Sequence, residues 1–144
     1  MALVTSSSGY AHVRLTVTDI ARSKAFYDQV FGWPIAVDMS DHVDEPGVRE
    51  SQEQLYGGVV YQTPSGALLG LRPVGSERFD SEHTGLDHIS FMAESRDHLV
   101  QAHDAFHDAG IPHGEVYNLD GFGIAILSFS DPDGVHLELT APLG

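Results

Sequence analysis

Two histidines and one carboxylate in this sequence have side chains suited to bind a divalent metal ion. Three segments that alternate apolar and polar residues each carry one of them on the polar side: His12 in residues 12–17, His88 in 88–92 and Glu138 in 135–140. Two neutral imidazoles and a carboxylate suit Fe, Mn, Zn, Ni or Co. Lewis-acid chemistry at such an ion also needs positions open to water or substrate. The pattern predicts a metal centre, although the polar sides could instead simply face solvent.

The elements that must position these residues occur in two copies. The turn Thr63–Gly66 and the apolar strand after it resemble the turn Asp131–Gly134 and its following strand. Residues 12–15 resemble residues 88–91 in the same way, so the two histidines occupy matching places. Such an internal repeat indicates a duplicated structural unit. If the copies pack with approximate twofold symmetry, the histidines converge, and the glutamate on the last strand can join them.

A helical pattern follows the first strand of each copy. Asp19 is a candidate N-cap for the first helix, which is expected to end near Gly32. Ser95 or Asp97 is the candidate N-cap for the second, which is expected to end near Gly110. Both segments have the apolar spacing of a half-buried helix.

Three strand-like segments follow each helix, so each copy reads as a βαβββ module. The first module covers residues 9–74 and the second covers 85–141, with a polar linker at 75–84. Together they predict one domain of the α+β class over residues 1–144. The first module is longer because of the acidic stretch 38–53, which is a candidate mobile loop or a solvated loop without function.

Composition excludes several classes of protein. The chain has 144 residues, 21 acidic and 7 basic, for a formal charge of −14, and no cysteine. A disulfide scaffold, a thiolate zinc site and a cysteine nucleophile are therefore excluded. The acidity argues against binding to nucleic acid or to anionic membranes. No apolar run is long enough to span a membrane, and the first residues lack the features of a signal peptide. We expect a cytoplasmic protein whose partner is a small molecule.

Four residues are candidates for contact with that small molecule. Arg14 and Arg72 lie on the polar sides of their strands, where each could bind an anionic substrate group or form an internal salt bridge. Ser90 shares the polar side of the second histidine's strand. Phe122 stands between two glycines and is either a pocket lid or an ordinary loop residue.

The sequence resembles the vicinal oxygen chelate superfamily, which includes glyoxalases, bleomycin-resistance proteins, extradiol dioxygenases and fosfomycin-resistance enzymes. The resemblance rests on segments spread over most of the chain: His12–Asp19, Ser23–Tyr27, Phe31–Gly32, Gly85–Phe91, Gly110–Pro112, Phe129–Gly134 and Leu137–Leu139. It implies a half-open, eight-stranded, barrel-like sheet with helices on its outer face. It also implies a homodimer.

The resemblance assigns the metal to His12, His88 and Glu138. The family's fourth ligand position falls on Gly70, which has no side chain to offer, and this departs from glyoxalase I. Ser128 stands where extradiol dioxygenases carry a tyrosine. The general base is left open between Glu138, a water on the metal and a loop carboxylate. We therefore expect a metal-dependent enzyme with isomerase, lyase or dioxygenase-like chemistry. The alternative is a metal-free protein that sequesters a drug or metabolite, as bleomycin-resistance proteins do.

Overall fold

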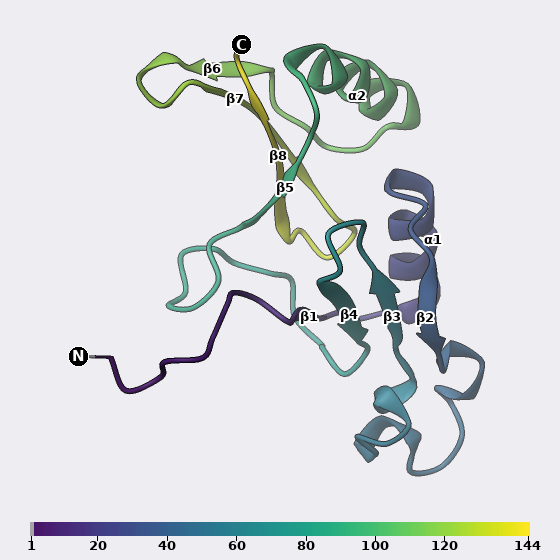
Figure 1. Ribbon diagram of the computed structural model, residues 1–144. Coiled ribbons are helices and arrows are strands. Elements are labelled where there is room, and N and C mark those ends of the chain that lie inside the picture. The colour runs from purple at the N-terminus through teal and green to yellow at the C-terminus, as the bar shows by residue number, and fades with distance from the viewer. Residues whose placement is uncertain (1) are drawn as a thin grey trace. The chain divides into compact units, whose positions relative to one another are not determined.

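The computed structural model describes residues 2–144 as two units, the first ending at Glu77 and the second beginning at Arg78 (Figure 1). The boundary falls inside the stretch 75–84. Each unit has one α-helix and one four-stranded mixed sheet. The α+β class and the two-module plan expected from the sequence are therefore confirmed. No helix among residues 2–144 is long and apolar enough to cross a membrane.

In the first unit, the strand order is β1-β4-β3-β2. The elements follow one another along the chain as β1 His12–Thr16, α1 Ile20–Val30, β2 Ile35–Asp38, β3 Val59–Gln62 and β4 Leu68–Arg72. β1 runs parallel to β4, and the other pairs are antiparallel. Three short 3-10 turns fill the long connection between β2 and β3: Ser40–His42, Val48–Glu50 and Leu55–Gly57.

The second unit repeats this arrangement, with strand order β5-β8-β7-β6. Its elements are β5 Ile89–Met92, α2 Arg96–Ala109, β6 Tyr117–Leu119, β7 Ile124–Ser130 and β8 His136–Pro142. β5 runs parallel to β8, as β1 does to β4. Both sheets are open, with unpaired edge strands, and neither closes on itself. Their combination into one half-open, eight-stranded, barrel-like sheet stays a prediction.

The helix boundaries follow from side-chain and backbone capping. Asp19 caps α1 by accepting a hydrogen bond from the N–H of Arg22 at 3.1 Å. Of the two candidates for α2, Ser95 is the N-cap, and its hydroxyl accepts from the N–H of His98 at 3.4 Å. Gly110 ends α2 in the left-handed conformation, with φ of 72°.

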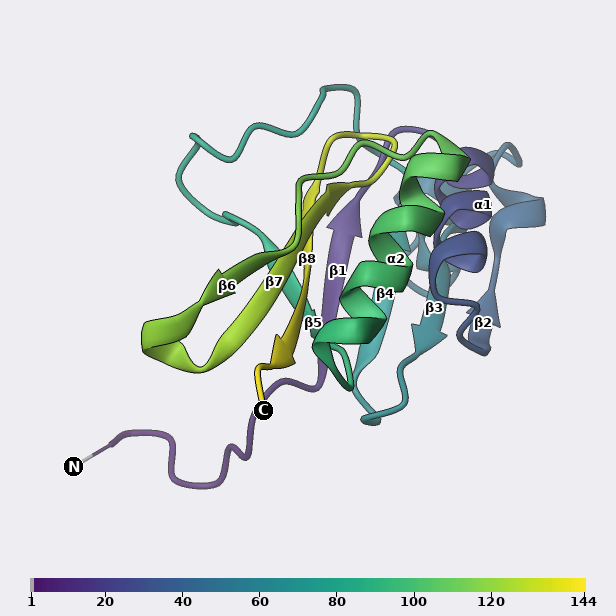
Figure 2. The same cartoon turned by 90° about the horizontal axis from the view of Figure 1, so that it is seen from above.

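One face of each sheet is apolar and buried. In the first unit this face carries Leu15, Leu69 and Leu71, which are at most 4% exposed. In the second unit α2 packs on β7 and β8 (Figure 2), where the rings of Phe106 and Phe129 stack with centroids 4.5 Å apart. Because side chains alternate along a strand, the opposite face of each sheet receives the polar residues. The alternation seen in the sequence therefore decides which residues are available to a functional site.

Tyr61 anchors α1 to the first sheet. Its ring is fully buried, and its hydroxyl donates a hydrogen bond to Asp28 Oδ1 at 2.9 Å. Burial first, and the neighbouring Asp28 carboxylate second, raise the pKa of the Tyr61 phenol.

We expect Tyr61→Phe to lower the free energy of unfolding at neutral pH by about 1–2 kcal/mol, because the bond to a carboxylate is lost. The raised pKa means that the unfolded phenol ionises first, near pH 10. The parent therefore loses part of its stability as the pH rises above that value, and the variant loses less. Urea unfolding at neutral and strongly alkaline pH measures both effects. An equal alkaline loss in the two proteins would contradict this account.

Candidate functional site

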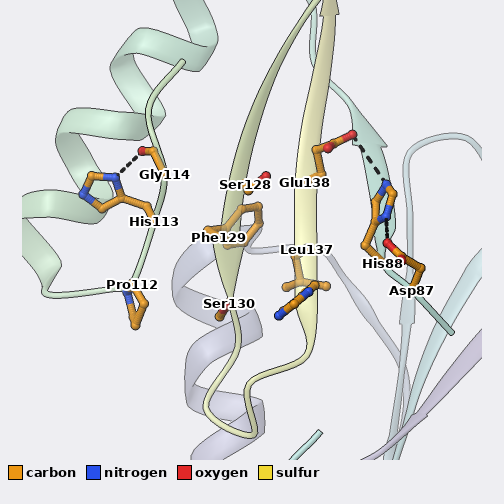
Figure 3. A pocket seen from close by; sticks show the side chains of 11 residues that line it. Asp87, His88, Pro112, His113, Gly114, Ser128, Phe129, Ser130, Leu137 and Glu138 are labelled. Atoms are coloured by element: carbon orange, nitrogen blue, oxygen red, sulfur yellow. Dashed lines mark hydrogen bonds and ion pairs between the residues drawn. The ribbon is translucent and has the colours of Figure 1, made fainter. Parts of the chain in front are cut away.

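The polar face of the second sheet borders a cavity of about 560 Å³. Figure 3 shows His88 and Glu138 on one side of this cavity and the Pro112–Gly114 segment on the other. Ser128 and Ser130 of β7 lie between them. The cavity therefore has a polar wall built from strands and a second wall built from the loop that follows α2.

His88 and Glu138 face each other across two neighbouring parallel strands. His88 immediately precedes β5, and Glu138 lies on β8 directly opposite Ser90. His88 Nε2 and Glu138 Oε1 are 3.8 Å apart, and the glutamate side chain is only 16% exposed. Two ligands, each about 2.1 Å from one ion in a tetrahedral centre, lie roughly 3.4 Å apart. The pair therefore needs to close by less than about 1 Å to share an ion.

A second carboxylate orients the histidine of this pair. His88 Nδ1 lies 2.6 Å from Asp87 Oδ1, so the Nδ1–H is the donor to Asp87. With its proton on Nδ1, His88 presents the lone pair of Nε2 toward Glu138, as Figure 3 shows for the ring orientation. A carboxylate behind a histidine is a common outer partner in metal centres, because it fixes the tautomer and raises the basicity of the ligand.

Hydroxyl groups orient the glutamate. The Thr140 hydroxyl donates to Glu138 Oε1 at 3.2 Å. The Ser90 hydroxyl oxygen lies 2.5 Å from that of Thr140, which extends the network back to β5. Glu138 Oε2 has no hydrogen bond among the described residues. Ser90 therefore supports the glutamate indirectly, and one carboxylate oxygen stays available.

The first unit supplies the remaining predicted ligand. His12 is the first residue of β1, and alternation places it on the same face as Arg14. Gly70 is paired directly with Arg14 across the parallel β1–β4 ladder, and it contributes no ligand. Among residues 2–144, no group of three or more His, Asp or Glu side chains is gathered closely enough to hold an ion. A three-residue centre that includes His12 therefore stays a prediction.

The other predicted contact residues fall in different places. Arg14 and Arg72 lie on one face of the first sheet, and both guanidinium groups lie over the ring of Tyr56. Phe122 is 80% exposed in the turn before β7 and does not line the cavity. Glu138 is paired with Ser128, which lies four residues beyond the start of β7 at Ile124, or roughly 13 Å along the strand at 3.3 Å per residue. The structure therefore does not bring Phe122 to the site.

Three residues with contacts at these two faces were not predicted from the sequence: Asp87, Thr140 and Tyr56. Asp87 could have been found, because it adjoins His88 and carries a carboxylate. Thr140 could also have been found, because a position two residues after Glu138 shares its face. Tyr56 lies in a connection without periodicity and gave no signal.

Comparison with known proteins identifies the family. A model of the Glyoxalase/Bleomycin resistance protein/Dioxygenase superfamily matches residues 9–139. The chain belongs to this superfamily. Among curated proteins, none matches it.

Solved structures of the superfamily share the fold. A glyoxylase/bleomycin resistance protein/dioxygenase domain from Frankia sp. EAN1pec has 27% identity and a TM-score of 0.73, over 95% of this chain and 99% of that one. Lactoylglutathione lyase from Agrobacterium tumefaciens has 21% identity and a TM-score of 0.68, over 95% and 96%. A mutant of the fosfomycin resistance protein FosX from Listeria monocytogenes, complexed with Mn(II) and a dihydroxypropylphosphonic acid, has 16% identity and a TM-score of 0.71, over 94% and 93%.

Proposed function

We propose that this chain is a metal-dependent enzyme of the vicinal oxygen chelate type that acts on a small molecule. His12, His88 and Glu138 would hold a divalent ion such as Mn, Fe, Zn, Ni or Co. The observation that carries the proposal is the His88–Glu138 pair, 3.8 Å apart, with Asp87 behind the histidine. The Mn(II) complex of the structurally similar FosX adds support from the fold.

The donor set fits a divalent ion. Nitrogen and carboxylate oxygen suit borderline ions better than Ca²⁺ or Mg²⁺, which prefer oxygen ligands. Three protein ligands leave further positions free, as a catalytic centre requires. Gly70, paired with Arg14 across the β1–β4 ladder, adds no side-chain ligand to these three.

A divalent ion held by these residues would supply Lewis-acid chemistry to adjacent oxygens of the substrate. Glu138 would take up the proton released from the neighbouring carbon on Oε2, since Oε1 already accepts the Thr140 hydroxyl. Asp87 keeps the proton of His88 on Nδ1 throughout. Isomerase and lyase reactions that pass through an enolate begin with such a proton transfer, and a dioxygenase-like reaction would use the same ligand set.

Paramagnetic broadening by Mn(II) tests the proposed centre. In the ¹⁵N spectrum of the full chain, amide signals next to His12, His88 and Glu138 should broaden together at substoichiometric Mn(II). Zn(II) at the same concentration serves as the diamagnetic control. Broadening confined to the acidic stretch 38–53 would overturn the proposal. No broadening at all would favour a metal-free protein that sequesters its ligand.

Asp87→Asn should weaken the metal centre without removing a ligand. The amide cannot fix the histidine tautomer as a carboxylate does, so we expect the affinity for Zn(II) to fall about 10-fold. Asp108→Asn is the matched control, because Asp108 is an exposed carboxylate on α2 of the same unit. Competition with a chromophoric chelator measures both affinities. Equal affinities for the two variants would refute the role of Asp87.

The resemblance adds two further proposals, a homodimer and a cytoplasmic location. Light scattering coupled to size exclusion measures the first directly. A monomer at micromolar concentration would contradict it.

A further inference from the structure

We infer that the polar face of the first sheet binds a carboxylate group between Arg14 and Arg72, with Tyr56 as the ring that holds both guanidinium groups. That the carboxylate belongs to the substrate rests on the function proposed above. The substrate class is then a small carboxylic acid with further oxygens for the metal.

Both arginines contact the ring of Tyr56. The guanidinium carbon of Arg72 lies 4.1 Å from the centroid of the Tyr56 ring, and that of Arg14 lies 5.3 Å from it. Both distances are within the range of a cation–π contact, which does not itself use the N–H donors of the guanidinium. These donors can bind a carboxylate with two parallel hydrogen bonds.

Gly70 gives Arg14 the space to reach this position. The two residues are directly paired across the β1–β4 ladder. A Cβ at position 70 would lie 3.2 Å from Cγ and 3.4 Å from Cδ of Arg14, which is tighter than ordinary contact. The missing side chain therefore leaves room for the aliphatic part of Arg14 beside Gly70. Gly70, which offers no side chain to a metal, thus leaves space for the side chain of Arg14.

The backbone of Tyr56 adopts a conformation that needs an explanation. Its φ is 59° and that of Leu55 is 51°, both in the left-handed region that favours glycine. Bulky side chains adopt this conformation only where surrounding structure holds it, and such positions gather at functional sites. Here the conformation places an aromatic ring under two cations.

Within the described part of the first unit, neither arginine forms an ion pair. The chain has three times as many acidic as basic residues, and Arg49 of the same unit does pair with a carboxylate, Asp44, at 3.1 Å. Among the described residues of the first unit, however, no carboxylate pairs with Arg14 or Arg72. The Nε of Arg72 is buried and has no hydrogen-bond partner among the described residues. Arg14 is exposed and Arg72 is half-buried, so an external anion can reach both positive charges.

The net charge of the chain and the shape of the guanidinium group favour a carboxylate over a phosphate as the bound anion. The formal charge of −14 repels a dianion more strongly than a monoanion, and a planar carboxylate matches the guanidinium fork. His12 lies two residues before Arg14 on the same face of β1. A carboxylate held by the arginines would therefore lie close to a proposed metal ligand of the same unit.

Titration of the metal-free full chain with acetate tests the inference. The side-chain Nε–Hε signals of the arginines are followed by ¹⁵N NMR at constant ionic strength, with acetamide as the uncharged probe of the same shape. We expect acetate to shift the Arg14 and Arg72 signals saturably and acetamide to leave them in place. No shift with acetate, or an equal shift with acetamide, would overturn the inference. Tighter binding of methylphosphonate than of acetate would overturn the assignment to a carboxylate.

Substitutions test whether acetate binds at Arg14 and Arg72. Arg14→Gln and Arg72→Gln should each weaken acetate binding at least about tenfold, since a charge-assisted pair is lost. Arg22→Gln, an exposed arginine on α1, removes the same charge elsewhere in the unit and should leave the affinity unchanged. Tyr56→Asn removes the ring while tolerating the left-handed backbone, and should weaken binding several-fold. If Arg22→Gln lowers the affinity for acetate equally, the effect comes from the net charge of the protein, and the proposed site is overturned.

The acetate titration does not depend on the proposed metal centre. Because the titration uses protein stripped of metal, acetate binding can fail while the metal centre is present, and the reverse can also occur. The two proposals are therefore distinguishable.

Discussion

Glu138→Ala is expected to lower the affinity of the protein for a divalent ion by at least about 100-fold. Loss of an outer partner of a metal ligand typically reduces affinity 10–100-fold, so loss of the ligand itself should exceed that range. The carboxylate is also the only one among the described residues within 4.0 Å of His88 Nε2. Isothermal titration with Mn(II) and Zn(II) measures the effect.

Two further variants make this prediction specific. Glu138→Gln keeps the shape of the side chain but removes its charge, and it should lose affinity nearly as strongly. Glu82→Ala removes an exposed glutamate from the same unit and should bind metal as the parent does. Because Glu138 makes a single described hydrogen bond to Thr140, the alanine variant should unfold at nearly the parent temperature without metal. Retained affinity in Glu138→Ala would exclude the residue as a ligand.

Gly58→Ala is expected to destabilise the first unit by about 3 kcal/mol, because overpacking against backbone cannot be relieved by a side-chain rotation. A Cβ at position 58 would lie 1.9 Å from the carbonyl oxygen of Leu71 and 2.9 Å from that of Leu55. This clash can be relieved only if β4 or the turn Leu55–Gly57 moves. The variant should therefore also lose the acetate response of Arg72, since the ring under that arginine shifts.

Thermal and urea unfolding followed by circular dichroism measure the loss of stability. Gly121→Ala is the matched control, because no heavy atom lies within 4 Å of the Cβ position there. If Gly58→Ala unfolds with the same midpoint as Gly121→Ala, the close approach of Gly58 to β4 does not limit stability.

Much of the fold could be predicted because it depends on local patterns. The alternation around His12, His88 and Glu138 was enough to assign each to the polar face of a strand, since side chains must alternate. Asp19 identified the start of α1 because an N-cap carboxylate satisfies a backbone N–H that the helix cannot. The repeat then fixed the order of the elements in the second unit from those in the first.

The parts that could not be predicted depend on contacts between distant segments. Ser95 and Asp97 were equivalent as caps until the backbone conformation of Ser95 was known. Nothing in the sequence marks Leu55 and Tyr56 for a left-handed backbone, which is normally signalled by glycine. The glycines around Phe122 suggested a lid, but they shape the turn between β6 and β7 and leave the ring exposed.

The metal content of the untagged protein tests the central claim most directly. Elemental mass spectrometry should find nearly one divalent ion per chain in the parent and little in His12→Ala or His88→Ala. His107→Ala, an exposed histidine on α2, should retain the parent content. A parent that contains no metal and takes up none when Fe, Mn, Ni, Co and Zn are added would contradict the account.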